Sequence, residues 1–394
     1  MTNMQSRQED NKLTIFLTGR VDSSNAAQTE EDIRSTLEGH AGEDLVLDVG
    51  DLEYISSAGL RVLMRLLRER GSLSVVNASL DVYDIFDMTG FTQIMDVQRA
   101  LRRVSVEGLP MIGAGANGQV YRLDEERIVK VYNPLTNTPQ KIAREKDAAR
   151  AAFVAGIPSA ISFEMVRVGE SYGIIYEMID ARTLGETIAR EPERLGEYAE
   201  RMAQLLHELH ATEFKPQTLP DARLSLHAWV DVAEQSGYYT SDVIAAARRL
   251  VDSIPPRNTF VHGDFHPGNI MVTADDEFLL IDMGDASVGD PIIDLLASYQ
   301  IIRLVADQPG GAQRYMGLSS EQAIGLWEAF ERAYYQTDDP QRLAAIEREL
   351  KFYVILRSMA GVTFSEVIPK EQRGHYANML SQALLAGMAK RAES

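Results

Sequence analysis

A polar loop followed by a short apolar strand, between residues 261 and 282, restricts the fold of this chain more than any other feature. The loop reads Val-His-Gly-Asp-Phe-His-Pro-Gly-Asn-Ile, which sets Asp264 and Asn269 five residues apart, and the apolar stretch Phe-Leu-Leu-Ile then leads into Asp282. Phosphoryl transfer needs a group that deprotonates the attacking hydroxyl and oxygen ligands that hold Mg²⁺ on the phosphates. Asp264 suits the first role, and Asn269 with Asp282 suits the second.

A glycine-rich segment lies upstream, with Gly113, Gly115 and Gly118 in the order G-x-G-x-x-G. Such glycines let the backbone approach phosphates and point amide N–H groups at them. A dinucleotide-binding turn uses the same spacing but opens a helix at the third glycine. Here residues 119–123 and 127–132 read as the two strands of a hairpin, which is typical of a kinase phosphate loop.

A lysine and a glutamate accompany this loop. Lys130 lies inside the second apolar strand, where a fixed positive charge suits the α- and β-phosphates. Thr138 as N-cap and Pro139 in the first turn predict that a helix follows. Glu145 falls within that helix. We expect it to pair with Lys130, and a surface pairing with an arginine is the alternative.

Residues from about 109 to 394 resemble the aminoglycoside phosphotransferase/choline kinase branch of the protein-kinase-like fold. The motifs HGDFHPGN at 262–269 and IDMGDASVGDPIIDL at 281–295 carry the resemblance. It implies an α+β bilobal domain, with a β-rich N-lobe to about residue 178, a helical C-lobe, and ATP with Mg²⁺ between them. Asp264 is then the catalytic base.

The resemblance also assigns the nucleotide contacts. Asn269 and Asp282 become the Mg²⁺ ligands, and Lys130 with Glu145 becomes the pair that anchors the phosphates. The Tyr-Glu-Met-Ile segment at 176–179 resembles the hinge, where Glu177 and Ile179 offer backbone groups to adenine.

Two further aspartates match family positions, and two departures limit the resemblance. Asp290 and Asp294 are expected to shape the loop and the start of a helix. Gly263 stands where protein kinases have an arginine, and no Ala-Pro-Glu segment follows Asp282. The expected acceptor is therefore the hydroxyl or amine of a small molecule.

Other chemistry-bearing residues are given structural roles. His207 and His210 are one residue too close for the zinc-binding pattern HExxH and lie in a strongly apolar helix. His262 is expected to make structural hydrogen bonds. Aromatic residues in the 214–258 insert line an acceptor pocket or, as we favour, fill the core: Trp229, Tyr238 and Tyr239. The stripe Leu350, Tyr353 and Leu356 reads as helix core.

The first hundred residues follow a different pattern, with strands at 13–17, 44–48 and 73–76 alternating with helices, which predicts a small α/β domain. The final run, 97–103, reads as helical. Gly-Leu-Pro at 108–110 breaks it, and the composition changes there. We place one domain over residues 1–104 and the second over 109–394.

Two segments of the first domain carry a resemblance of their own. Ile-Ser-Ser-Ala-Gly-Leu at 55–60 and Ile-Phe-Asp-Met-Thr-Gly-Phe at 85–91 are similar to an anti-sigma factor antagonist (STAS) domain over about 10–103. Helix capping alone also explains a serine at 56 or 57. The family's phosphoacceptor serine falls on Ser57, although the residue before it, commonly aspartate, is Ser56. The resemblance implies an anti-sigma factor or a serine kinase as partner.

Composition excludes several classes of protein. There is no cysteine, which excludes disulfides, thiolate zinc sites and a cysteine nucleophile. The net charge of −19 argues against nucleic-acid or anionic-membrane binding. No run of 18 apolar residues occurs and the N-terminus lacks an apolar signal segment, so we expect a soluble, cytoplasmic protein.

The leading hypothesis is an ATP- and Mg²⁺-dependent phosphotransferase for a small molecule, joined to a STAS regulatory domain. One alternative is an interaction protein of the anti-sigma antagonist type, whose kinase-like half binds nucleotide without turnover. The other is a switch that phosphorylates itself at Ser57.

Overall fold

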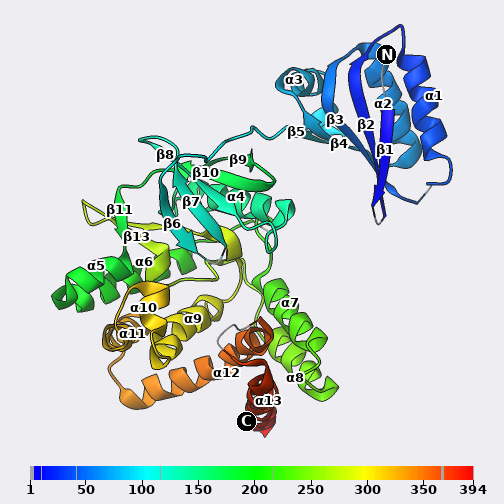
Figure 1. Ribbon diagram of the computed structural model, residues 1–394. Coiled ribbons are helices and arrows are strands. Elements are labelled where there is room, and N and C mark those ends of the chain that lie inside the picture. The colour runs from blue at the N-terminus through cyan, green and yellow to red at the C-terminus, as the bar shows by residue number, and fades with distance from the viewer. Residues whose placement is uncertain are drawn as a thin grey trace. The chain divides into compact units, whose positions relative to one another are not determined.

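A computed structural model describes residues 4–9, 11–40, 42–115, 117–215, 217–364 and 368–393. The chain divides into two compact units, residues 1–104 and 105–394, and Figure 1 shows the elements of each. None of the helices in the described ranges combines the length and apolar character needed to cross a membrane.

The N-terminal unit is a five-stranded sheet with three helices (Figure 1). Its strands lie in the order β1-β2-β3-β4-β5, antiparallel between β1 and β2 and parallel between the others. The strands are β1 (Met4–Glu9), β2 (Lys12–Val21), β3 (Asp44–Ile55), β4 (Ser74–Ala78) and β5 (Asp96–Arg99). The helices are α1 (Ala26–Leu37), α2 (Ser57–Arg70) and α3 (Leu80–Met88), followed by the short 3₁₀ helix η1 (Phe91–Gln93).

Alternating side chains explain how β2 covers the core of this unit. Leu13, Ile15 and Leu17 are buried, whereas the residues between them are partly exposed, because successive side chains of a strand point to opposite faces. Parallel strands joined through helices form this sheet, as expected for an α/β domain.

The helix expected at 97–103 is wrong. Residues Asp96–Arg99 form β5, the last strand of the sheet, and Val97 pairs with Val75 of β4. A seven-residue segment without a cap is too short to be stable as an isolated helix, whereas the free side of β4 offers backbone partners.

The second unit begins with a five-stranded antiparallel sheet, the N-lobe, in the order β6-β7-β8-β10-β9. Its strands are β6 (Met111–Gly115), β7 (Gly118–Arg122), β8 (Arg127–Tyr132), β9 (Ser162–Val168) and β10 (Ser171–Glu177). Helix α4 (Pro139–Val154) packs against β9 and β10. Thr138 caps it by accepting a hydrogen bond from the Lys141 N–H (3.3 Å), and Pro139 is its first residue.

The rest of this unit, the C-lobe, is helical (Figure 1). Its helices are α5 (Leu184–Arg190), α6 (Leu195–Ala211), α7 (Ala222–Gln235), α8 (Ser241–Asp252), α9 (Ile292–Ser298), α10 (Gly311–Met316), α11 (Ser320–Tyr335), α12 (Pro340–Phe364) and α13 (Lys370–Glu393). Short strands lie beside them. β13 (Ile270–Thr273) pairs with β11 (Ala181–Thr183) on one side and with β14 (Phe278–Leu280) on the other, and β12 (Phe260–Val261) pairs with β15 (Ser287–Val288). The core of the C-lobe includes Phe265, Trp327 and Phe330, all almost fully buried.

Together these elements form an α/β domain followed by a protein-kinase-like domain. The sheet of the N-lobe leads through residues 178–180 into the C-lobe, and the loop with Asp264 connects β12 to β13 at the start of the second half of the C-lobe.

Candidate active site

The loop that carries Asp264 is held in place by its own backbone. Gly263 has φ +82°, and a Cβ there would stand 2.6 Å from the carbonyl oxygen of Asp285, so no other residue fits without displacing the chain. After Asp264, the short 3₁₀ helix η3 (Pro267–Asn269) turns the chain into β13. Gly263 thus lets the chain pass close to Asp285 immediately before the residue that carries the carboxylate.

Asp294 of α9 supports this loop from beneath. Its side chain is fully buried and accepts hydrogen bonds from the backbone N–H groups of His262 (3.0 Å) and Gly263 (2.6 Å). His210 of α6 lies against the same carboxylate, with Nε2 3.1 Å from Oδ2, and its Nδ1 is 2.8 Å from the Tyr334 hydroxyl. Asp294 therefore connects α6 and α9 to the two residues that precede Asp264.

The remaining histidines of these segments also make structural contacts. His262 bridges the loop to the strand before Asp282, since its Nε2 is 3.1 Å from the Ile281 carbonyl and its Nδ1 accepts from the Asp264 N–H (3.3 Å). His207 stacks on the Tyr334 ring with 4.4 Å between ring centroids. Within the described residues, no group of three or more His, Cys, Asp or Glu side chains is arranged to hold a metal ion.

The carboxylate of Asp264 is surrounded by donors. Oδ2 accepts from Asn269 Nδ2 (3.2 Å) and lies 3.4 Å from His266 Nε2, and Oδ1 accepts from Arg357 Nη2 (3.0 Å). Burial by itself raises the pKa of Asp264, but the hydrogen bond and charge of His266 and the charge of Arg357 outweigh it, so the pKa lies below its ordinary value. Asp264 is thus held as a carboxylate, ready to accept a hydrogen bond from a hydroxyl.

The side-chain oxygen of Asn269 is available to a ligand. Its Nδ2 donates to the carbonyl and to the carboxylate of Asp264 (2.9 and 3.2 Å), which directs the amide group, and the side chain is buried. Its Oδ1 accepts no hydrogen bond from any residue that the structure describes. Amide and carboxylate oxygens suit a hard cation, and Mg²⁺ needs only one or two such protein ligands beside phosphate oxygens. Asn269 and Asp282 fit that ion.

Asp282 adopts an unusual backbone conformation after β14. Its φ of +62° and ψ of +68° lie in the left-handed region, which only a few non-glycine residue types tolerate. The conformation brings Oδ1 to 2.9 Å from the ammonium group of Lys130. Because β8 of the N-lobe carries Lys130, this ion pair joins the two lobes.

Lys130 also pairs with Glu145 of α4, at 2.8 Å from Nζ to Oε1. The same glutamate oxygen accepts hydrogen bonds from the hydroxyl groups of Tyr132 (2.6 Å) and Tyr176 (3.2 Å). Burial lowers the pKa of Lys130, but the charges of Asp282 and Glu145 outweigh burial and leave it above the ordinary value. The lysine therefore stays positively charged at the junction of the lobes.

The glycine-rich turn joins β6 to β7. Gly113 and Gly115 lie on β6, and Ala116 lies outside the described residues. Gly118 opens β7, where the chain runs so close to β8 that a Cβ would overlap the Val131 carbonyl oxygen. A β-carbon added at Gly115 would have no atom of the described residues within 4 Å, so this side of the turn is open with respect to them.

The segment expected to be a hinge begins inside β10, whose last residue is Glu177. The N–H of Glu177 donates to the Ile161 carbonyl (3.0 Å), and its carboxylate accepts from the Ile161 N–H (2.7 Å). These two bonds hold Glu177 in a defined orientation, and Ile179 lies two residues further on, outside the strands. The structure thus connects Glu177 to the N-lobe, apart from the cluster around Lys130.

Sequence reasoning missed Arg357 of α12, whereas the core role favoured for Trp229 of α7 agrees with its packing against the hydrophobic core. The guanidinium carbon of Arg357 lies 5.4 Å from the centre of the Trp229 ring, and its Nη2 reaches Asp264. Trp229 is only partly buried. The signal was present, because Arg357 follows the apolar residues Leu350 and Tyr353 at helical spacing and so stands on their face of the helix.

The N-terminal unit holds the remaining predicted residue. Ser56 caps α2, with its hydroxyl accepting from the N–H groups of Ala58 (3.2 Å) and Gly59 (3.4 Å). Ser57 is the first residue of α2 and is exposed. The two serines therefore differ in role, because Ser56 is engaged in the cap while Ser57 faces solvent.

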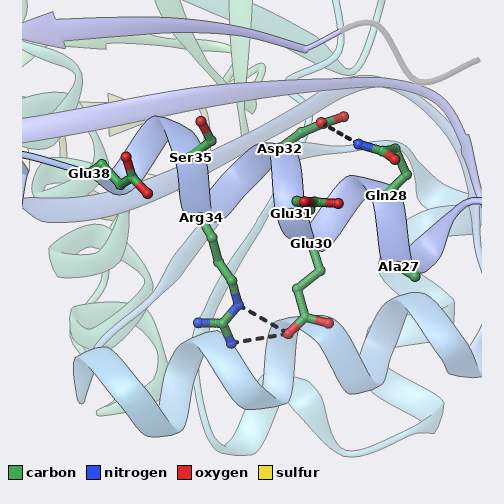
Figure 2. Close-up of a pocket in the computed structure, with 8 residues that line it drawn as sticks. All are labelled: Ala27, Gln28, Glu30, Glu31, Asp32, Arg34, Ser35 and Glu38. Carbon is green, nitrogen blue, oxygen red and sulfur yellow. Dashed lines mark hydrogen bonds and ion pairs between the residues drawn. The ribbon is translucent and has the colours of Figure 1, made fainter.

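A shallow hollow on α1 belongs to this same unit (Figure 2). Polar and acidic side chains line it, and Glu30 and Arg34 form an ion pair at 3.1 Å along the helix. Gln28 and Asp32 are joined by a hydrogen bond of 2.9 Å. Such i to i+4 pairs are ordinary for an exposed helix face, and they carry no catalytic chemistry.

A match to a family model defines the class of protein to which this chain belongs. Residues 109–346 match the family model described as "Phosphotransferase enzyme family", and the chain belongs to this family. Residues 4–109 match the model described as "Mlab, STAS domain". The chain is therefore a phosphotransferase with a STAS domain.

Each unit is also similar to individual known proteins. A Bordetella bronchiseptica protein named as a candidate anti-sigma factor antagonist, BtrV, is 37% identical over 93 residues, which are 22% of this chain and 78% of that protein. The anti-sigma-B factor antagonist of Bacillus subtilis is 28% identical over 99 residues, 24% of this chain and 89% of that protein. The ADP-bound crystal structure of the aminoglycoside phosphotransferase APH(2'')-Ib is 18% identical, with a TM-score of 0.48, over 71% of this chain and 93% of that one.

Proposed function

We propose that residues 109–394 transfer the terminal phosphoryl group of ATP, bound with Mg²⁺, to the hydroxyl or amine of a small molecule. The observation that carries the proposal is the convergence of three elements. The loop with Asp264 and Asn269 is joined to the residue before Asp282, because the Ile281 N–H donates to the Asn269 carbonyl (3.0 Å). Asp282 and Glu145 in turn both contact the ammonium group of Lys130 in the N-lobe, at 2.9 and 2.8 Å. This set holds the parts that phosphoryl transfer needs, in separate positions.

Each residue has a task in the proposed reaction. Asp264 accepts the proton of the acceptor's hydroxyl while the oxygen of that hydroxyl forms a bond to the γ-phosphorus. The bond between the γ-phosphorus and the β,γ-bridging oxygen breaks, which releases ADP. Lys130, held by Glu145, binds phosphate oxygens. Asn269 and Asp282 hold Mg²⁺, which supplies positive charge to the phosphates.

The nucleotide is proposed to lie beneath the glycine-rich turn. Gly113, Gly115 and Gly118 let the backbone approach the phosphates. Glu177 and Ile179 offer backbone groups to the adenine. Because the Glu177 N–H is already bonded to Ile161, its carbonyl is the group assigned to the base.

Asp264→Asn tests this function, because it keeps the shape of the side chain but removes the proton acceptor. We expect ATP consumption with Mg²⁺ to fall by at least 100-fold, while nucleotide binding, measured by calorimetry, persists. The matched control is Asp275→Asn, an exposed aspartate between β13 and β14 of the same segment. Unchanged ATP consumption in the Asp264 variant would disprove the role of this residue.

A second function is proposed for the N-terminal unit, residues 1–104, as a module that binds an anti-sigma factor and is switched at Ser57. The exposed position of Ser57 at the start of α2 supports it. A phosphate there is compatible with the positive end of the helix and changes the charge of the surface.

Peptide mass spectrometry after incubation with Mg²⁺ and ATP tests where the phosphate of Ser57 comes from. Phosphate on Ser57 that disappears in the Asp264→Asn variant would mean that the kinase domain modifies its own chain or a neighbouring copy. An unmodified Ser57 in both proteins would mean that the kinase domain does not phosphorylate it, and a switch at Ser57 would then require a separate serine kinase.

A further inference from the structure

Arg357 reaches the site from outside the part of the chain that matches the family model. It lies on α12, beyond residue 346, and is separated from Asp264 by 93 residues. Its Nη2 donates to Asp264 Oδ1 (3.0 Å), the oxygen that Asn269 and His266 leave free. A hydroxyl that uses Asp264 Oδ1 as its base therefore shares this oxygen with Arg357.

Only part of the guanidinium is used. Nη1 is buried and makes no hydrogen bond with any residue in the described ranges. The side chain as a whole is 23% exposed, and its guanidinium carbon lies 5.4 Å from the centre of the Trp229 ring. An unpaired buried donor is costly, and a guanidinium is shaped to bind a carboxylate or a phosphate through two parallel hydrogen bonds.

The charged groups around Arg357 do not use all the hydrogen-bond donors of its guanidinium group. Asp264 is its one ion-pair partner among the described residues. Burial and the charge of Asp264 raise the pKa of the nearby Asp285, and the charge of Arg357 acts in the opposite direction, but within the described residues no ion pair joins Arg357 to Asp285. Lys130 is already paired with Glu145 and Asp282. The free guanidinium donors beside the catalytic carboxylate thus belong to Arg357.

We propose that Arg357 recognises the acceptor, and that the acceptor is an alcohol bearing a carboxylate or a phosphate. The inference rests on the proposed phosphotransfer, since it requires that the acceptor hydroxyl reach Asp264. The anionic group replaces Asp264 as the partner of Arg357, which frees Oδ1 to accept the hydroxyl proton. A cationic acceptor meets a like charge at the same place.

Four probes that share a three-carbon hydroxylated skeleton test the charge preference: glycerate, glycerol 3-phosphate, glycerol and 3-aminopropane-1,2-diol. Calorimetry with the full chain, loaded with Mg²⁺ and a non-hydrolysable ATP analogue, gives a Kd for each. We expect at least one of the two anions to bind tenfold or more tightly than glycerol and the amine to bind most weakly. The carboxylate and phosphate arms distinguish the two anionic groups.

Two variants assign the preference to the residue. Arg357→Gln should remove the advantage of the anions, and Arg357→Lys should restore part of it. The matched control is Arg332→Gln, an exposed arginine of α11 whose partner is Glu328 at 3.7 Å, and it should leave the ranking unchanged. Equal binding of all four probes, tighter binding of the amine, no binding of any probe, or a ranking that survives Arg357→Gln would overturn the inference.

Kinetics separate recognition from a purely positioning role. If Arg357 recognises the acceptor, Arg357→Gln raises KM for the anionic acceptor far more than for glycerol. If it only orients Asp264, kcat falls by the same factor for every acceptor, which contradicts the inference. A wild-type protein that does not bind nucleotide would refute the proposed phosphotransfer instead. Failure of the proposed function can therefore be distinguished from failure of the inference about Arg357.

Discussion

Replacing Asp294 by alanine tests whether this buried carboxylate holds the catalytic loop. The substitution leaves the N–H groups of His262 and Gly263 without their acceptor, at a position that is fully buried. It also leaves Nε2 of His210 without a partner at 3.1 Å. Hydrogen bonds to a charged group contribute about 1.5–3 kcal/mol each and do not add fully, and breaking a buried pair costs about 3–5 kcal/mol. We therefore expect the free energy of unfolding to fall by about 3–5 kcal/mol.

Urea unfolding followed by tryptophan fluorescence measures this loss. Both tryptophans, Trp229 and Trp327, lie in the unit 105–394, so the signal reports that unit without interference from the N-terminal one. The matched control is Asp290→Ala. Asp290 is paired with the more exposed Arg257 at 2.7 Å and accepts a hydrogen bond from the Ile292 N–H at the start of α9 (3.1 Å), so we expect a loss of about 1–2 kcal/mol.

Two results would refute the reasoning. One is a loss below about 1 kcal/mol in the Asp294 variant, and the other is a loss no larger than that of the Asp290 variant. A double-mutant cycle with His210→Ala adds a further check, because residues that share a buried hydrogen bond should couple by about 0.5–3 kcal/mol.

Three further outcomes are expected. Gly118→Ala should lower stability by about 1–3 kcal/mol, because the β-carbon of the new alanine would overlap the Val131 carbonyl. Gly115→Ala should change stability by less than about 0.5 kcal/mol, and thermal unfolding compares the two variants. Tyr132→Phe removes a buried hydrogen bond to Glu145 and should cost about 1–2 kcal/mol by urea unfolding. Burial, with a smaller effect of a nearby glutamate, raises the pKa of Glu331 to about 7. Since the folded-state pKa lies above the usual 4.5, stability should fall as pH rises from about 5 to 7, and Glu331→Gln should remove that slope and add about 1–2 kcal/mol at pH 8.

The sequence could predict those parts of the site that lie close together along the chain. The order of Asp264, Asn269 and Asp282 within 19 residues is enough to suggest their chemistry, because a short loop and one hairpin bring them together. The caps of α2 and α4, at Ser56 and Thr138, could be read in the same way, since a cap bonds only to the next few backbone groups.

Distant contacts could not be read in this way. Residues in the segment expected to be a helix at 97–103 form β5 instead. They pair with the free side of β4, which belongs to a separate segment and cannot be read from the local pattern. The hydroxyl groups of Tyr132 and Tyr176 meet on Glu145 only because β8, β10 and α4 pack together.

What the sequence by itself determined is therefore the class of each domain and the loop residues that we propose for catalysis, through short-range spacing and backbone preferences. The tertiary structure alone decided that His210 and Asp294 hold the loop from beneath and that Arg357 stands beside Asp264. The physical reason is that the packing angles of α6, α9 and α12 set these positions, and those angles depend on side chains along whole helices rather than on any local pattern.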